Sequence, residues 1–90
     1  MAIRVSVSGP LRVFTGDQKE VVSAGATVHE VLADLITRFP AMRSKLYEDD
    51  ELAGFINIFV NDEDLRSLAG EDTALSDGDK VSIIYAIAGG

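Results

Sequence analysis

A single amphipathic helix is the feature that most constrains the fold of this chain. Thr27 precedes Glu30 by three residues, the spacing of a capping box in which each side chain satisfies a free backbone donor at a helix start. Pro40 disfavours helical geometry at Phe39 and so predicts the end of the helix. Between these signals the apolar residues recur at helical spacing and form one stripe: Val28, Val31, Leu32, Leu35, Ile36 and Phe39. One helix with one apolar face must pack against another layer.

The residues before the helix predict a β-hairpin. Ile3, Val5 and Val7 alternate with polar residues, which is typical of a half-buried strand. Gly9-Pro10 interrupts this strand, and a second apolar piece, residues 11–14, leads into a turn at residues 15–17. The chain then returns through residues 20–22, so residues 2–23 read as a hairpin with an irregular first arm.

Two further strands and a last strand follow the helix. The stretch FINIFV places Ile56, Ile58 and Val60 on one face, and Asn61-Asp62 suits a two-residue turn that tolerates positive φ. A short strand around Leu65 should return, followed by an irregular crossing over residues 68–75. A turn at Asp77-Gly78 then precedes the final strand, KVSIIYAI.

Residues 41–54 carry a short helical segment, 41–46, and then four adjacent acids, residues 48–51. We expect these acids to form a solvated loop, because four adjacent side chains cannot converge on one ion without a tight glycine-containing loop. His29, the single histidine, is expected to face solvent near the helix start. The sequence therefore indicates no metal site and no catalytic residue.

The order hairpin, helix, two strands and final strand predicts an α+β fold in one domain, residues 1–90. It corresponds to a β-grasp (ubiquitin-like) roll, a mixed sheet of four to five strands with one main helix across one face. The final strand is the most apolar, so we expect it in the sheet interior beside the first strand. The last residues, about 87–90, then form a flexible tail leaving a rigid platform.

Composition narrows the functions that such a domain can perform. The 90 residues include no cysteine, which excludes disulfides, thiolate metal sites and a cysteine nucleophile on this chain. The formal charge of −7 disfavours nucleic acid and anionic membranes and favours a partner with a basic docking surface. No apolar run approaches the roughly 18 residues of a membrane span, and the start, MAIRVSVSG, is unlike a signal peptide. We expect a cytoplasmic protein.

From FINIFVNDEDLR through LSDGDKVSIIYAIAGG the chain resembles the ThiS/MoaD family of ubiquitin-like sulfur carrier proteins, and within it the CysO-type carriers. The motif that carries this resemblance is the Asp-Gly-Asp turn combined with the terminal Gly-Gly. The β-grasp order extends the likeness over the whole chain.

The resemblance implies that Gly90 is the modified residue of a non-enzymatic sulfur carrier. An E1-like adenylating enzyme would use ATP to activate its carboxylate, and a thiocarboxylate on Gly90 would then donate sulfur to a biosynthetic enzyme. The partner would recognise the tail through Ile87, Ala88 and Gly89, and the chain itself would bind no cofactor. Cysteine biosynthesis is the expected acceptor pathway, with molybdopterin, thiamin and a secondary metabolite as alternatives.

Two other functions remain open at this point. The chain could be a ubiquitin-like modifier that is conjugated to lysines through Gly90, or the small subunit of a complex like molybdopterin synthase. Strand alternation also predicts a partner-docking patch on the helix-free sheet face, formed by Phe59 and Ile84 and extended by Phe55. Acids near the tail, Asp62, Glu63 and Asp64, are expected to meet basic residues of the activating enzyme.

Overall fold

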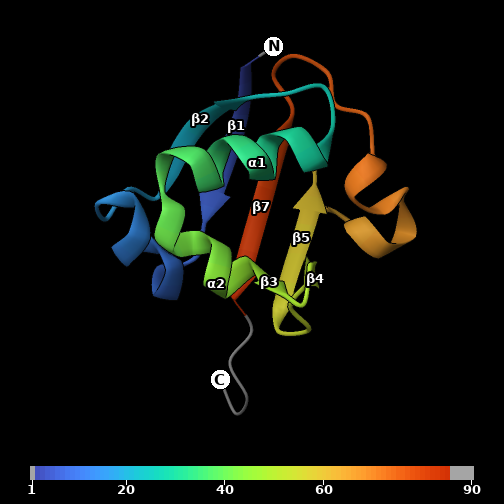
Figure 1. Ribbon diagram of the computed structural model, residues 1–90. Coiled ribbons are helices and arrows are strands. Elements are labelled where there is room, and N and C mark those ends of the chain that lie inside the picture. Colours follow the sequence, from blue (N-terminus) through green and yellow to red (C-terminus); the bar gives the residue numbers. More distant parts are fainter. Residues whose placement is uncertain (1, 86–90) are drawn as a thin grey trace.

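The computed structural model describes residues 2–85 of the chain, with one helix packed across a mixed sheet (Figure 1). Within these residues the main sheet has five strands in the order β2-β1-β7-β5-β6, and β7 pairs with β1 in parallel and with β5 antiparallel. The predicted β-grasp architecture and the interior position of the final strand are confirmed. The strands of this sheet are β1 (Ala2–Val7), β2 (Glu20–Ala24), β5 (Ile56–Val60), β6 (Glu63–Asp64) and β7 (Lys80–Tyr85).

Helix α1 (Val28–Arg38) begins and ends where the sequence signals place it. The Thr27 hydroxyl accepts a hydrogen bond from the Glu30 backbone N–H at 3.2 Å, while the Glu30 carboxylate accepts one from the Ala26 N–H at 3.0 Å. Both bonds satisfy donors that have no partner inside the helix. Thr27 therefore caps the helix as expected, the reciprocal bond of Glu30 goes to Ala26 instead of to Thr27, and Phe39 is the first residue outside helical geometry.

The core lies between α1 and the sheet. Every second residue of β1, β7 and β5 points toward the helix, and the helix contributes the buried part of its apolar stripe. Full burial of one such aliphatic side chain contributes roughly 1.5–3 kcal/mol. The buried residues of these elements are Ile3, Val5, Val7, Val28, Val31, Leu32, Leu35, Ile56, Ile58, Val60, Val81 and Ile83.

The connection between β1 and β2 differs from the expected irregular strand. Residues 9–15 form a 3-10 helix, η1 (Gly9–Thr15), with Pro10 in its first turn and Gly16, whose φ is 66°, as its C-cap. Pro10 supplies the fixed φ of a first helical turn, and Gly16 adopts the left-handed conformation at low steric cost. The hairpin itself is confirmed, because β1 and β2 pair antiparallel with Ile3 opposite Ser23.

The acidic run is exposed as expected, but it is not a loop. It forms a small separate hairpin of β3 (Tyr47–Glu48) and β4 (Glu51–Leu52). Asp49 and Asp50 occupy its turn with φ values of 50° and 67°. Asp tolerates this left-handed conformation better than most residues, which explains why two carboxylates can form a tight turn.

The remaining segments are short. Residues 40–46 form η2 (Pro40–Met42) and α2 (Arg43–Leu46), as the sequence predicts. The short returning strand expected around Leu65 is present as β6, but it stops at Asp64, and the buried Leu65 begins η3 (Leu65–Ser67). The crossing to β7 contains η4 (Gly70–Asp72). Among residues 2–85, none of the helices has both the length and the apolar character needed to cross a membrane.

Strand β2 lies at one border of the sheet, and a side chain from α1 covers part of it. The Arg38 guanidinium donates a hydrogen bond to the Val22 carbonyl at 2.8 Å and pairs with the Asp34 carboxylate at 3.0 Å. That carboxylate also accepts a hydrogen bond from the Ser23 hydroxyl at 2.7 Å. These contacts tie the helix to the outermost long strand.

Gly25, between β2 and α1, provides a stability test. A Cβ at this position would lie 2.9 Å from the backbone nitrogen of Val31 and 2.9 Å from the Cβ of Glu30. We predict that Gly25→Ala lowers the free energy of unfolding by about 1–3 kcal/mol, because backbone atoms of α1 must shift. Urea unfolding followed by circular dichroism measures this loss.

Gly9→Ala is the matched control, since a Cβ there would have no neighbour within 4 Å. Its unfolding free energy should stay within about 0.5 kcal/mol of the parent chain. Equal stability of the two variants would contradict the close packing at Gly25.

Candidate functional site

Strand β7 carries the chain to the predicted reactive tail, and its end is held on several sides. The Tyr85 backbone N–H donates a hydrogen bond to the Ser8 hydroxyl at 3.0 Å. The Tyr85 ring lies against the Phe55 ring with centroids 4.9 Å apart. β7 runs between β1 and β5 and ends at the opposite end of the sheet from the start of β1 (Figure 1). Tyr85 is therefore held in place at the end of β7. We call Tyr85, together with its contacts to Ser8 and Phe55, the tail root.

The residues predicted to react or to be recognised in the tail are not part of this description. Gly90, Gly89, Ala88 and Ile87 all lie outside residues 2–85. Their roles remain predictions.

The structure places Phe59 and Ile84 on the helix-free face of the sheet. Ile84 is opposite Asn57, and Phe59 is opposite Ser82, so the two apolar residues are diagonal neighbours across β5 and β7. Ile84 is 41% exposed and Phe59 is half-buried. Phe55 precedes β5 and packs against the core and Tyr85, so its ring supports the tail root. The docking role of all three residues remains a prediction.

The acids next to this face are not equivalent. Asp64 pairs with Arg66 at 3.0 Å and also accepts the Arg66 backbone N–H at 2.8 Å. The side-chain hydrogen bond from Arg66 is the main reason that the pKa of Asp64 is below its ordinary value. Asp62 and Glu63 are exposed at the β5–β6 turn. The expectation that these acids lie near the tail is wrong, because Val60, which precedes them, pairs with Val81 at the start of β7, whereas Tyr85 at its end pairs with Ile56. That they meet a basic partner remains a prediction, and the exposed Asp62 and Glu63 are better placed for it than Asp64.

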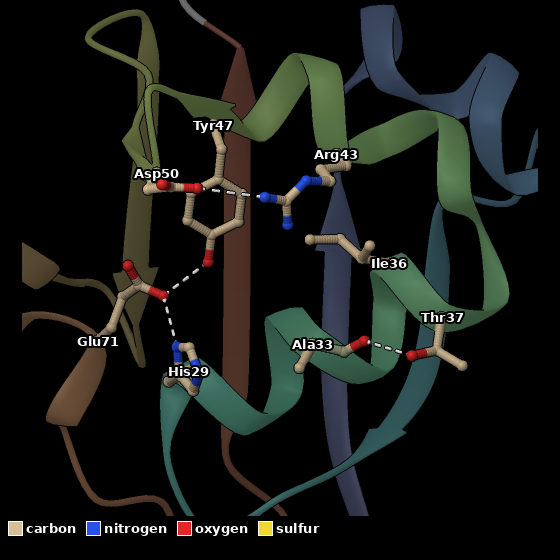
Figure 2. Close-up of a pocket in the computed structure, with 8 residues that line it drawn as sticks. All are labelled: His29, Ala33, Ile36, Thr37, Arg43, Tyr47, Asp50 and Glu71. Atoms are coloured by element: carbon tan, nitrogen blue, oxygen red, sulfur yellow. Dashed lines mark hydrogen bonds and ion pairs between the residues drawn. The ribbon is translucent and has the colours of Figure 1, made fainter.

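A separate cavity of about 480 Å³ opens on the helix side, between α1, the β3–β4 hairpin and η4 (Figure 2). Its charges are largely paired with one another. One oxygen of the Glu71 carboxylate accepts a hydrogen bond from the Tyr47 hydroxyl at 2.6 Å and lies 3.1 Å from His29 Nδ1. Arg43 pairs with Asp50 at 3.3 Å. The sequence predicted His29 as solvent-facing, and its side chain is 66% exposed, but its contact with Glu71, 42 positions away, could not be inferred from spacing.

This cavity shows no activated nucleophile. Burial, followed by the hydrogen bond to Glu71, raises the pKa of the Tyr47 hydroxyl well above its ordinary value, so the side chain is a neutral donor near pH 7. Within residues 2–85, no group of three or more His, Cys, Asp or Glu side chains is arranged to hold a metal ion. The cavity therefore supports no catalytic role.

The comparisons with known proteins agree with this reading. The profile of the ThiS family matches residues 5–90. The chain belongs to the ThiS family. This confirms the resemblance to ThiS/MoaD carriers that the C-terminal motif indicated.

Relatives within and around the ThiS family are similar over most of their length. Sulfur carrier protein CysO of Mycobacterium tuberculosis is 41% identical over 93 residues, covering 100% of both chains. A crystal structure of the BexX/CysO complex of Amycolatopsis orientalis contains a chain with a TM-score of 0.91 and 40% identity, covering 99% of this chain and 100% of that one. Small archaeal modifier protein 3 of Haloferax volcanii is 38% identical over 69 residues, covering 77% of this chain and 75% of that protein.

The turn that precedes β7 contains a carboxylate, that of Asp79, whose ionisation makes the stability of the fold depend on pH. The Asp79 carboxylate accepts hydrogen bonds from the Ser76 backbone N–H at 2.8 Å and from the Asn61 side chain at 3.0 Å. The Ser76 bond, and then the Asn61 bond, hold the pKa of Asp79 below its ordinary value of 3.8. The ionised carboxylate therefore favours folding above pH 3.8, and this contribution is lost as the pH falls through the folded-state pKa.

We predict that Asp79→Asn is less stable than the parent chain at neutral pH, and that the difference narrows below pH 3.8. Urea unfolding of both proteins across this pH range measures the effect. Glu63→Gln, at the exposed turn nearby, is the control. Its free energy of unfolding should match that of the parent chain both at neutral pH and below pH 3.8. A stability difference that is constant across this range would disprove the role of the Asp79 charge.

Proposed function

We propose that this ThiS-family protein carries sulfur as a thiocarboxylate on Gly90. The observation that carries the proposal is the 41% identity, over the full length of both chains, with a protein named sulfur carrier protein CysO. The placement of β7 supports it, since the central strand of a rigid sheet leads toward the Gly-Gly end. The protein is the substrate in this reaction, and the adenylating partner is the enzyme.

The chemistry suits a chain without cysteine. The Gly90 carboxylate attacks the α-phosphorus of ATP in the partner enzyme, and pyrophosphate leaves. Sulfide then attacks the acyl carbon and AMP leaves, so a C–S bond replaces a C–O bond. If a persulfide attacks instead, AMP leaves in the same way, and a thiol then reduces the S–S bond of the acyl disulfide to release the thiocarboxylate and a disulfide. Gly89 and Gly90 have no Cβ, which lets the backbone pass close to the walls of a narrow channel.

The resemblance to CysO-type carriers leads us to place the sulfur acceptor in cysteine biosynthesis. The partners are then an adenylating enzyme and an acceptor enzyme, in the cytoplasm. A complex of CysO with BexX supports the idea that a chain of this shape docks on a second protein.

Conjugation to other proteins is the second candidate function. It is favoured by the similarity to small archaeal modifier protein 3. Covalent adducts in cell lysate that disappear when Gly90 is deleted would identify it. The two functions use the same activated carboxyl group and are therefore compatible.

Gly90 gives the direct test of the carrier function. Incubation with the adenylating enzyme, ATP and sulfide should raise the protein mass by about 16 Da, the difference between sulfur and oxygen. Fragmentation mass spectrometry should locate the gain at Gly90. Deletion of Gly90, or extension beyond it, should abolish the gain and leave the thermal midpoint nearly unchanged, because no described core residue is touched. A gain at another residue, or activation of an untrimmed extended chain, would refute the proposal.

The sheet face gives a second test. Truncation of Phe59 in Phe59→Ala should weaken binding to the adenylating enzyme by about tenfold, as expected when an aromatic docking residue is lost. Calorimetric titration measures this affinity. Val22→Ala on β2, an exposed apolar residue at the far border of the sheet, is the control and should bind like the parent chain. Unchanged affinity of Phe59→Ala would exclude this residue from the docking surface.

A further inference from the structure

An apolar groove borders the tail root on the side of η1. It has a volume of about 320 Å³ and is lined by Pro10, Leu11, Val13, Phe14, Lys45 and Tyr85. Leu11 is fully buried and anchors η1 to the core, whereas Val13 is 74% exposed. A single exposed valine is ordinary, but here Val13 adjoins Pro10, Phe14 and Tyr85, and a contiguous apolar surface of this kind is typical of a contact site.

The position of this groove is fixed relative to the tail. Ser8, the residue before η1, accepts the hydrogen bond from the Tyr85 N–H, so η1 begins directly beside the end of β7. Lys45 of α2 contributes the positive charge among the lining residues. The groove therefore combines apolar side chains with one cation, on a chain whose formal charge is −7.

The short distance between Tyr85 and Gly90 brings the surface of any partner that reacts with Gly90 close to this groove. Five residues follow Tyr85, and a fully extended chain spans at most about 3.6 Å per residue, so Gly90 can lie no farther than about 18 Å from Tyr85. If Gly90 reacts inside a channel of a partner, the mouth of that channel must lie closer still. The partner surface around that mouth then has to meet the residues around the tail root.

We propose that this groove docks the adenylating enzyme, which presents an apolar side chain against Val13 and Phe14 and a carboxylate against Lys45. This inference rests on the proposed activation of Gly90. Adenylation is the step that requires the most exact positioning, because the free carboxylate is unreactive until it is aligned with the α-phosphate of ATP. The groove lies beside the tail root and is distinct from the Phe59 and Ile84 patch, so it supplies a second contact on the enzyme.

The test compares two exposed valines in the full-length protein. Val13→Asp places a charge in the groove, and Val22→Asp places the same charge on β2, where Val22 is 60% exposed. Each variant is incubated with the E1-like adenylating enzyme encoded in the same genome. The rate of ATP–pyrophosphate exchange then gives the kcat/KM of the enzyme for that variant. We expect Val13→Asp to lower kcat/KM about tenfold or more, and Val22→Asp to change it by less than about twofold. Lys45→Glu should also lower it, and restoration by Lys45→Arg would show that the charge is responsible.

Thermal unfolding confirms that each variant is folded before its kinetics are compared. Exchange by Val13→Asp equal to that of the parent chain would overturn the proposal. So would normal exchange with loss of sulfur delivery, which would assign the groove to the acceptor enzyme. Dimerisation of the parent chain that Val13→Asp abolishes would assign the groove to a second copy. A shift of the Val13 methyl resonances on removal of residues 86–90 would assign it to the tail itself.

Failure of this inference differs from failure of the proposed function. If the parent chain supports exchange and gains about 16 Da, but Val13→Asp does the same, only the groove assignment is wrong. If the parent chain supports neither reaction, activation of Gly90 is wrong and the groove assignment falls with it.

Discussion

The pairing of β7 on both sides is the constraint on which the rest of this structure depends. Its parallel partner β1 places Val5 beside Val81, and its antiparallel partner β5 places Ile58 beside Ile83. These side chains form the floor on which α1 packs. Because β7 follows the long crossing from β6, the sheet is complete only when the last described element of the chain is in place. The same pairing of β7 therefore stabilises the domain and fixes the position of the tail root.

The two faces of the sheet differ in burial and in exposed apolar surface. The helix side holds the core and a cavity whose charges largely neutralise one another, as in the contacts of Glu71 with Tyr47 and His29. The helix-free side carries the exposed Ile84, and η1, beside the end of β7, carries the exposed Val13. This arrangement suits a protein whose chemistry occurs in the active sites of other proteins. In the proposed function, the folded domain presents Gly90 and its surface selects the enzyme.

Periodicity accounts for most of what could be predicted from the sequence. The stripe from Val28 to Leu35 and the alternation in β5 and β7 describe burial, and burial decides which face of each element meets the core. The errors fall where local conformation depends on backbone geometry. The pattern indicates an interruption at Pro10, which lies in the first turn of a 3-10 helix, and a solvated loop at Asp49-Asp50, which form a tight turn.

In the candidate site, too, local patterns predicted some features, whereas contacts between distant residues could not be predicted. Alternation placed Phe59 and Ile84 on the outer face, because that inference needs only one strand at a time. The contacts between Ser8 and Tyr85 and between His29 and Glu71 join residues 77 and 42 positions apart, and no local pattern encodes them. Val13 is exposed because of the 3-10 turn that the sequence pattern did not reveal.

The Arg38 guanidinium on the Val22 carbonyl has a consequence for how this domain can be recognised. Many small sheets bind partners by accepting an extra strand at an open border, where backbone groups are free to pair. Here the acceptor at the middle of β2 is already occupied, and its arginine is held in turn by Asp34. A strand that pairs with Val22 would have to displace Arg38 before it gained a hydrogen bond there. Recognition through side chains meets no such barrier at this position, so the contact disfavours strand addition along β2.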